Sequence, residues 1–238
     1  MMALITGAAQ RLGRAMAETL HAAGYDVWLH YHHSQKACEQ LATGLNASRP
    51  DSASVIQADL GASEGADILV DIILTHTSRL SVLVNNASIY TADPQHRHTQ
   101  QERLYQCNSR TPVRLIEGLT PNLCPQGNII NITDIYAEFP RNEYSHYCHS
   151  KQQLADATRH YALKLAPKVR VNAIAPGAML WAEGQNETPV YRATLLKQIP
   201  LERLGGTQAI CEALLFLLRC DYMTGQTLRV DGGRSLTL

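Results

Sequence analysis

The strongest constraint on this sequence is a regular alternation of short apolar runs with longer amphipathic segments. The apolar runs are candidate strands, at residues 3–6, 26–30, 53–58, 82–85, 128–133, 169–174 and 227–230. Candidate helices begin near Arg11, Gln35, Glu64, Gln100, Tyr144 and Thr207. Strands that are separated by helices pair in parallel through right-handed crossovers. The pattern therefore predicts an α/β fold, with a doubly wound parallel sheet of about seven strands and helices on both faces.

The same rhythm runs along the whole chain, with no internal repeat and no low-complexity linker. We therefore expect one domain that spans residues 1–238. Several apolar runs, such as Val-Leu-Val at 82–84, do not alternate with polar residues, which is typical of strands covered on both faces. A longer piece at about 178–201 interrupts the rhythm and contains Pro189 and Pro200. We expect a substrate-covering loop with some helix there.

Composition excludes several classes of function. The formal net charge is zero, so the chain lacks the basic surface of a protein that binds nucleic acid or anionic membranes. No apolar stretch approaches the roughly 20 residues of a membrane span. Residues 1–6 lead directly into a glycine turn, so we expect no signal peptide. The six cysteines include no Cys-x-x-Cys pair, as expected for reduced, mostly buried thiols. We therefore expect a cytoplasmic protein.

A glycine turn between the first strand and the first helix reads Thr6-Gly7-Ala8-Ala9-Gln10-Arg11-Leu12-Gly13. Such a turn brings backbone N–H groups and the positive end of a helix dipole against a diphosphate. Dinucleotide-binding turns usually contain three glycines, and Arg11 occupies the middle position here. The segment predicts a nucleotide site, although an ordinary strand–helix turn has similar glycines.

The second strand ends in His30-Tyr31-His32-His33-Ser34, a segment without a carboxylate. NAD-binding folds usually place a carboxylate here for the ribose 2′-hydroxyl, whereas NADP-binding folds place a cation or neutral donors for the 2′-phosphate. The hydroxyl of Ser34 and the imidazoles of His32 and His33 therefore favour NADPH. A metal site built from the three histidines is an alternative, but no carboxylate or thiolate is spaced to complete it. His30 itself is expected to be a hydrogen-bonded strand residue.

Polar residues also close the third and fourth candidate strands. Asp59 and Leu60 follow the third strand, and Asn86-Ala87-Ser88 follow the fourth. Ligands of open parallel sheets collect at the carboxyl ends of the strands. Asp59 is therefore a candidate acceptor for an adenine amine, and Asn86 a candidate to hold the backbone beside the adenosine ribose. Both residue types also form ordinary turns.

A tyrosine and a lysine carry the predicted chemistry. Tyr147 and Lys151 are four residues apart in a predicted helix, which places both side chains on one face. Tyrosine ordinarily titrates near ~10, and a neighbouring ammonium is expected to lower the pKa of the Tyr147 phenol toward neutrality. Asp134 closes the fifth candidate strand and therefore reaches the same edge of the sheet. An exposed helix pair without catalytic function is the alternative.

Four short motifs follow one another along the chain: Thr-Gly-x-x-x-Arg-x-Gly at 6–13, Asn-Asn-Ala-Ser at 85–88, Tyr-x-x-x-Lys at 147–151 and Pro-Gly at 176–177. Together they resemble the short-chain dehydrogenase/reductase family over essentially the whole chain. The resemblance implies a Rossmann-type fold and a nicotinamide cofactor. Arg11 in the glycine turn, the histidine segment, and Asp134 in place of the usual serine or threonine further resemble the pteridine reductases and the related bacterial dihydromonapterin reductases.

The resemblance also implies catalytic roles. Tyr147 is the implied proton donor, and Lys151 is its partner, which also holds the nicotinamide ribose. Asp134 matches the carboxylate that assists protonation. Asn108 has the position of an asparagine that supports a water molecule and the lysine.

The same resemblance implies the ligand contacts. Tyr90 takes the place of the aromatic residue that stacks on the pterin, Arg11 contacts both the cofactor phosphate and the pterin, and Ser88 contacts the cofactor or the pterin. One departure is His33, which stands where pteridine reductases have arginine and implies a weaker, pH-dependent grip on the 2′-phosphate. The cofactor-binding set is Gly7, Arg11, Leu12, Gly13, His32, His33, Ser34, Asp59, Leu60, Asn86, Ala87, Ser88, Tyr147, Lys151, Pro176 and Gly177.

These features together predict NADPH-dependent reduction of a 7,8-dihydropterin, such as dihydrobiopterin, dihydromonapterin or dihydrofolate, to the tetrahydro form. The resemblance also implies a homotetramer. A reductase of a ketone or a 3-oxoacyl substrate is one alternative, and Asp134 argues against it because a hydroxyl binds a carbonyl more simply. A non-catalytic NADP-binding sensor or scaffold is the other, and the presence of Asn108, Tyr147 and Lys151 argues against it.

Overall fold

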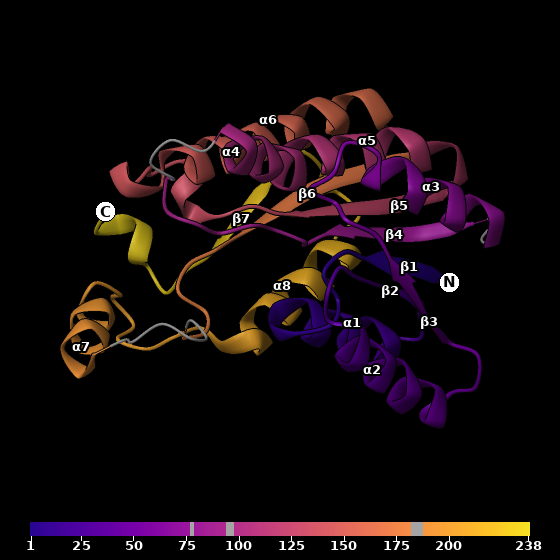
Figure 1. The fold of residues 1–238 in the computed structure, drawn as a ribbon, viewed down its shortest axis with the longest axis horizontal. Coiled ribbons are helices and arrows are strands. Elements are labelled where there is room, and N and C mark those ends of the chain that lie inside the picture. Colours follow the sequence, from indigo (N-terminus) through magenta and orange to yellow (C-terminus); the bar gives the residue numbers. More distant parts are fainter. Residues whose placement is uncertain (77–78, 94–97, 182–187) are drawn as a thin grey trace.

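A parallel sheet of seven strands forms the centre of the computed structural model, which describes residues 1–76, 79–93, 98–181 and 188–238 (Figure 1). The strand order is β3-β2-β1-β4-β5-β6-β7, and every neighbouring pair is parallel. The strands are β1 (Met2–Ile5), β2 (Asp26–Tyr31), β3 (Ala53–Gln57), β4 (Leu80–Asn85), β5 (Leu123–Ile132), β6 (Val169–Pro176) and β7 (Thr227–Val230). The predicted doubly wound, Rossmann-type sheet is confirmed, with the switch in winding direction between β1 and β4.

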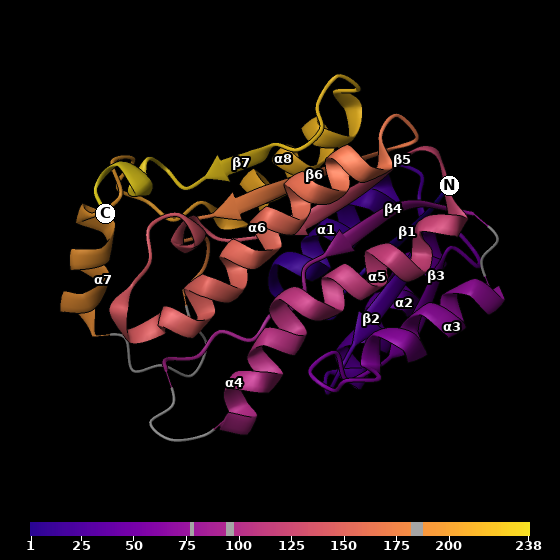
Figure 2. The same ribbon diagram turned by 90° about the horizontal axis from the view of Figure 1, so that it is seen from above.

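Helices cover both faces of the sheet. The helices are α1 (Arg11–Ala22), α2 (Gln35–Ser48), α3 (Gly65–His76), α4 (His98–Tyr105), α5 (Thr111–Leu119), α6 (Ser145–Leu165), α7 (Pro189–Lys197) and α8 (Gly206–Arg219). Helices α1, α2 and α8 lie on one face, and α3, α4, α5 and α6 lie on the other (Figures 1 and 2). Helix α7 lies apart from both layers, near the C-terminus.

The core consists of two apolar clusters, one on each face of the sheet. Successive strand residues alternate between them: Ile5 packs beneath α1 and α8, whereas its neighbour Leu4 packs toward α3 and α5. Val82–Val84 is buried throughout, because helices cover both faces of β4. Four of the six cysteines are also buried.

The segment after β4, where one helix was expected to begin near Gln100, contains two α-helices joined by a π-helical turn. Helix α4 ends at Tyr105, a π-helical turn follows at Gln106–Arg110, and α5 then begins with Pro112 in its first turn. Proline is tolerated in the first turn because its missing N–H has no helical partner there. The break therefore comes from the wide π-helical turn, a feature that often marks a functional position, and Asn108 lies inside it.

The piece expected to cover the substrate contains α7, in agreement with the predicted helix. Part of the predicted loop, residues 182–187, lies outside the described residues. Within the described ranges, none of the helices combines the length and the apolar character that crossing a membrane requires.

Candidate active site

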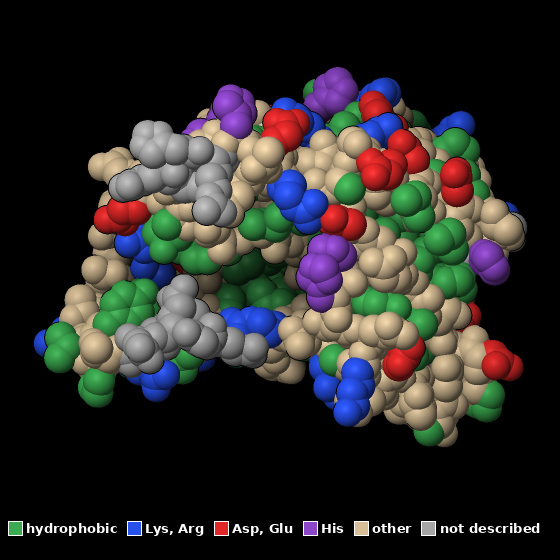
Figure 3. All heavy atoms as spheres, viewed as in Figure 1, with side chains coloured by type: hydrophobic (Ala, Val, Ile, Leu, Met, Phe, Trp, Pro, Cys, Tyr) green, Lys and Arg blue, Asp and Glu red, His purple; other side chains and the backbone are tan. Residues whose placement is uncertain are grey.

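A cavity of about 720 Å³ opens at the carboxyl ends of β1, β4, β5 and β6, and appears as the hollow in Figure 3. Its volume lies in the range of small-molecule and cofactor sites. Its walls include Arg11 after β1, Ser88 after β4, Asp134 after β5 and Gly177 after β6. The sheet edge thus brings together residues that are far apart in the sequence.

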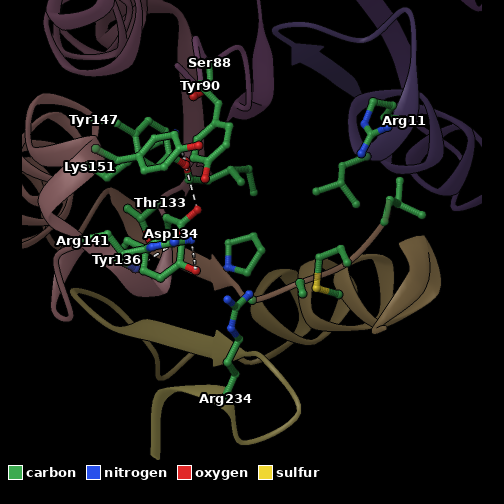
Figure 4. A pocket seen from close by; sticks show the side chains of 18 of the residues that line it. Arg11, Ser88, Tyr90, Thr133, Asp134, Tyr136, Arg141, Tyr147, Lys151 and Arg234 are labelled. Carbon is green, nitrogen blue, oxygen red and sulfur yellow. Dashed lines mark hydrogen bonds between the residues drawn. The ribbon is translucent and has the colours of Figure 1, made fainter. Parts of the chain in front are cut away.

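Tyr147 and Asp134 form a direct hydrogen-bonded pair in the cavity wall (Figure 4). The Tyr147 hydroxyl donates to Oδ2 of Asp134 at 2.7 Å. Oδ1 of the same carboxyl accepts from the backbone N–H of Tyr136 at 2.9 Å and caps the short 3₁₀ turn Ile135–Ala137. The cap fixes the carboxyl group, and the first turns of α6 fix the tyrosine, so the pair has a defined geometry.

The pKa values of this pair differ from the sequence prediction. Burial raises the pKa of Tyr147 well above its usual value, and the Asp134 charge and hydrogen bond raise it further. The prediction of a phenol with a lowered pKa is therefore wrong. The physical reason is that the phenol donates to a carboxyl group, which stabilises the protonated tyrosine.

The Asp134 carboxyl group also titrates abnormally. Burial raises its pKa and outweighs the hydrogen bonds from Tyr136 and Tyr147 and the charges of Lys151 and Arg234, which lower it. Asp134 therefore holds a proton more readily than an exposed aspartate does. A phenol and a carboxyl group that share one hydrogen bond titrate as a unit.

Lys151 is 2% exposed and lies on the same face of α6 as Tyr147. Its ammonium donates to the carbonyl oxygen of Ile132 at 2.9 Å and lies 5.8 Å from the centroid of the Tyr147 ring. Burial lowers the pKa of Lys151 to about 8, although the Asp134 charge opposes the shift. The structure thus places the cation beside the ring of the tyrosine.

Asn108 is fully buried and holds the loop that follows β4. Its Oδ1 accepts from the backbone N–H of Ile89 at 2.8 Å and from the hydroxyl of Ser88 at 3.2 Å. Its Nδ2 donates to the Ile89 carbonyl and to the hydroxyl of Ser150. The structure therefore brings Asn108 to the loop residues 88–89 and to α6, and no direct hydrogen bond joins it to Lys151 among the described residues.

Hydrogen bonds to a residue of β2 and from a residue at the end of β4 hold the glycine turn in place. The N–H of Gly7 donates to Nδ1 of His30 at 3.0 Å, and the opposite ring nitrogen of His30 bonds the Ala58 carbonyl. Asn86 donates from Nδ2 to the carbonyl of Gly7 at 3.1 Å. A Cβ at Gly13 would lie 2.0 Å from the Gly7 carbonyl oxygen, so this close approach requires glycine. The prediction that His30 is a hydrogen-bonded strand residue is confirmed.

Arg11 faces the Tyr147–Asp134 pair from the opposite side of the cavity (Figure 4). Its guanidinium donates to the carbonyl of Trp181 at 3.1 Å. Its φ of 52° lies in the left-handed region that a non-glycine residue seldom adopts. The chain thus keeps a glycine-like conformation at this position while it adds a cation to the cavity.

Four residues predicted to bind the adenosine end, His32, His33, Ser34 and Asp59, form a separate cluster at the rim, whereas Asn86 lines the cavity. Asp59 accepts from Arg103 through both carboxylate oxygens, at 3.0 Å each, and His32 lies 3.6 Å from it. The His32 ring is 3.5 Å from that of His33, and Ser34 is the N-cap residue of α2. Sequence reasoning missed Arg103, because α4 approaches β3 only in the folded chain.

Three other residues predicted to contact the cofactor, Leu12, Leu60 and Ala87, lie in different environments. Leu60 is 4% exposed and packs in the apolar core, so its side chain does not face the rim. Leu12 lines the cavity. Ala87 packs beside the same core cluster as Leu60.

Tyr90 forms part of an aromatic cluster. Its ring stacks on that of Tyr144 at 4.8 Å with an interplanar angle of 9°, and meets the Tyr147 ring edge-on at 4.7 Å. Tyr144 therefore occupies one face of the ring that the sequence assigned to ligand stacking.

Sequence reasoning also missed Tyr136, Arg141 and Arg234, which all line the cavity. Both guanidinium groups lie 5.5 Å from the centroid of the Tyr136 ring. Arg234 directly follows Asp231-Gly232-Gly233, so that motif was the available signal. Pro176 and Gly177 lie where predicted, in the wall of the cavity.

Among the residues that the structure describes, no group of three or more histidine, cysteine, aspartate or glutamate side chains is arranged to hold a metal ion. Both ring nitrogens of His30 are already hydrogen-bonded within the protein.

A family model described as enoyl-(acyl carrier protein) reductase matches residues 7–235. Pteridine reductase 1 of Leishmania tarentolae is 32% identical, over 99% of this chain and 96% of the relative. Dihydromonapterin reductase of Klebsiella pneumoniae is 32% identical, over 98% and 96%. A 3-oxoacyl-[acyl-carrier-protein] reductase of Staphylococcus aureus is 30% identical, over 97% and 96%.

Proposed function

Because the chain belongs to the short-chain dehydrogenase/reductase family, a family of oxidoreductases, we propose that it reduces a 7,8-dihydropterin to the tetrahydro form with NADPH. The observation that carries the proposal is the 2.7 Å hydrogen bond between Tyr147 and Asp134 in the cavity wall. This pair suits protonation of a ring nitrogen. The names of two relatives, a pteridine reductase and a dihydromonapterin reductase, support the same substrate class.

The residues at the nucleotide end fit NADPH. Helix α1 has no acidic residue in its first turn, and its N-cap side chain makes no capping hydrogen bond, so the positive helix end is available to a diphosphate. The turn after β2 offers His32, His33 and Ser34 and no carboxylate, which suits a 2′-phosphate. Lys151 would hold the nicotinamide ribose. NADPH supplies the hydride when it is bound.

The reaction adds a hydride to C6 and a proton to N5 of the C6=N5 imine. In this proposal Tyr147 and Asp134 hold the proton that N5 receives. The raised pKa of Asp134 keeps its carboxyl group in the proton-carrying form to a higher pH than usual, which suits a general acid. The raised pKa of Tyr147 keeps its phenol protonated. Bulk water then restores the proton to the pair.

The remaining cavity residues suit a flat, polar ring. Tyr90 and Tyr144 supply aromatic surface, and Arg11 supplies donors across the cavity from the acid pair. The neighbouring Thr133 hydroxyl donates to the Ile174 carbonyl at 3.0 Å, so it is turned away from Tyr147. The carboxyl group of Asp134, rather than a hydroxyl, is thus the partner of the tyrosine, which favours an imine over a ketone as substrate.

The first test measures NADPH oxidation by the purified protein with dihydrobiopterin, dihydromonapterin and dihydrofolate. An acetoacetyl thioester and a simple ketone are the controls. We expect turnover of at least one pterin, and its loss in Tyr147→Phe. Reduction of the thioester or ketone without any pterin turnover would refute the substrate class and favour the 3-oxoacyl alternative. Bound NADPH without turnover of any substrate would favour a non-catalytic sensor or scaffold.

We further propose a cytoplasmic homotetramer that pairs through the faces of α4, α5 and α6, which lie side by side on one surface (Figure 2). Light scattering of the purified protein tests the assembly, and a monomer at micromolar concentration would contradict it.

A further inference from the structure

Arg234 is a buried cation in the cavity that the proposed reaction does not use. Its side chain lines the cavity, and the residue is only 7% exposed. Figure 4 shows it reaching from the C-terminal segment toward the corner that holds Asp134 and Tyr136. Its guanidinium carbon lies 5.5 Å from the centroid of the Tyr136 ring. Arg234 therefore points toward the same corner of the cavity as the Tyr147–Asp134 pair.

A rigid turn fixes the direction of Arg234. Gly232 and Gly233 adopt φ values of 65° and 85°, and the Asp231 carboxylate accepts from the N–H groups of Gly233 and Ser235. A Cβ at Gly177 would lie 2.6 Å from the Cβ of Asp231, so the turn packs directly against the cavity wall. The arginine thus projects from a fixed support, as precise ligand recognition requires.

The guanidinium group of Arg234 lacks a polar partner. Its Nε is buried without a hydrogen-bond partner, and across residues 1–76, 79–93, 98–181 and 188–238 the guanidinium forms no hydrogen bond or ion pair. Lys151 and Arg141, by contrast, bond the Ile132 carbonyl and the Glu143 carboxylate. A buried Nε donor without an acceptor costs free energy. A ligand that carries an acceptor would recover this cost.

We propose that Arg234 is an anion-recognition residue that selects substrates with a carboxylate, or a similar anionic group, next to the reacting bond. Guanidinium binds carboxylate through two parallel N–H···O bonds. A neutral substituent of the same size leaves buried donors unsatisfied, and sites of this kind discriminate strongly against such analogues. The identification of the substrate as a pterin rests on the proposed function, whereas the requirement for an anionic group applies to any substrate of this cavity.

The test compares two ligands that share the pterin ring and differ in charge, pterin-6-carboxylate and 6-hydroxymethylpterin. Their binding to the full chain with NADP⁺ is measured by quenching of pterin fluorescence. We expect the carboxylate to bind about 10- to 100-fold more tightly, the effect of one or two charged hydrogen bonds. Arg234→Met should reduce this preference to less than about threefold, and Arg234→Lys should restore part of it.

The matched control is Arg229→Met. Arg229 lies on β7, stacks on Phe139 and pairs with Glu138, and it does not line the cavity. Its loss should leave the preference unchanged. A wild-type protein that binds both pterins equally, or an Arg234→Met variant that keeps the full preference, overturns the proposal.

A second pair, benzoate and benzyl alcohol, has the same difference in charge on a ring unrelated to pterins. Ligand-observed NMR measures their weak binding. If neither pterin binds while Arg234→Met abolishes a preference for benzoate, the dihydropterin proposal fails and the role of Arg234 stands. If neither pair shows a preference for the anion, the role of Arg234 is refuted whatever the reaction.

Discussion

The two ends of the site differ in how far their charged side chains are exposed to solvent. At the nucleotide rim, the side chains of His32, Asp59 and Arg103 are 32%, 31% and 45% exposed. At the catalytic end, Tyr147 and Lys151 are 4% and 2% exposed. Each end contains one carboxyl group: Asp59 accepts from an arginine, whereas Asp134 accepts from a tyrosine hydroxyl and a backbone N–H. The two ends therefore differ both in their surroundings and in the kind of donor.

The carboxyl groups shift in opposite directions. At the rim, partial burial acts to raise the pKa of Asp59, but the hydrogen bonds from the Gly61 N–H and from Arg103 outweigh it, and the pKa is lowered. At the catalytic end, burial outweighs the hydrogen bonds, and the pKa of Asp134 is raised. The rim thus keeps a fixed charge that solvent screens, whereas the buried end keeps a transferable proton.

The largest expected effect comes from Tyr147→Phe at the buried end. Loss of the phenol removes the proposed proton donor, and we expect the rate to fall by about 10²- to 10⁴-fold. The rim is untouched, so NADPH affinity should change little. Tyr161→Phe is the matched control, because Tyr161 lies on the same helix but bonds Glu117 away from the cavity. Steady-state kinetics and cofactor titration distinguish the two variants, and a fully active Tyr147→Phe enzyme would end the proposal of a tyrosine acid.

Asp134→Asn tests whether the proton or only the hydrogen bond matters. The single oxygen of asparagine still accepts from the Tyr136 N–H, and its amide N–H₂ donates to the Tyr147 oxygen in place of the second carboxylate oxygen, but the side chain holds no transferable proton. We expect turnover to fall by about 10- to 100-fold with each pterin substrate. Normal turnover would mean that Asp134 only positions the tyrosine.

The pH dependence of kcat/KM should report the titration of the buried Lys151. The pKa of Lys151 is lowered to about 8, so the ammonium is present below that pH and is lost as the pH rises through it. If the ammonium is required, kcat/KM falls about tenfold per pH unit above that point. In Asp134→Asn this alkaline limb should begin at lower pH, because the Asp134 charge opposes the lowering of the Lys151 pKa. A limb that stays in place would argue against coupling between the two groups.

Substitutions at the rim should have smaller effects, because solvent screens the charges there. Arg103→Met leaves the Asp59 carboxylate without its cation near the proposed 2′-phosphate site, and we expect the KM for NADPH to rise about three- to tenfold. His33→Arg adds a cation and should lower that KM. Arg110→Met is the control, since Arg110 pairs with Glu102 instead. An effect of Arg103→Met as large as that of Tyr147→Phe would invalidate the distinction between the two ends.

Local patterns in the sequence were enough to predict the elements of the fold. The expected starts of α1 and α2 match, and each of the seven expected strands exists. The start of β5 was misplaced, because Pro125, Gln126 and Gly127 read as a turn whereas the strand begins at Leu123. Gln126 has a φ of 67°, and the pairing register of β4 with β5 shifts after Leu80, so the irregularity lies inside the strand.

The positions of Asp134, Tyr147 and Lys151 were predictable because short motifs at strand ends and helix faces fix them. Their titration was not, because burial and the direction of the Tyr147 hydrogen bond depend on packing. Arg103 and Arg234 were missed for a related reason. Each reaches the site from an element distant in the sequence, and no spacing pattern reports that approach.

The sequence by itself determined the order of strands and helices, the glycine turn and the residues at the carboxyl ends of the strands. These follow from periodicity and from backbone conformation, which act over a few residues. The tertiary structure alone decided which of these residues share a cavity and in which direction their pKa values shift. It also decided that Arg234 points inward with no hydrogen-bond or ion-pair partner among the described residues. Such properties depend on desolvation and on contacts between distant segments, which exist only once the sheet and its two helical layers have closed around the site.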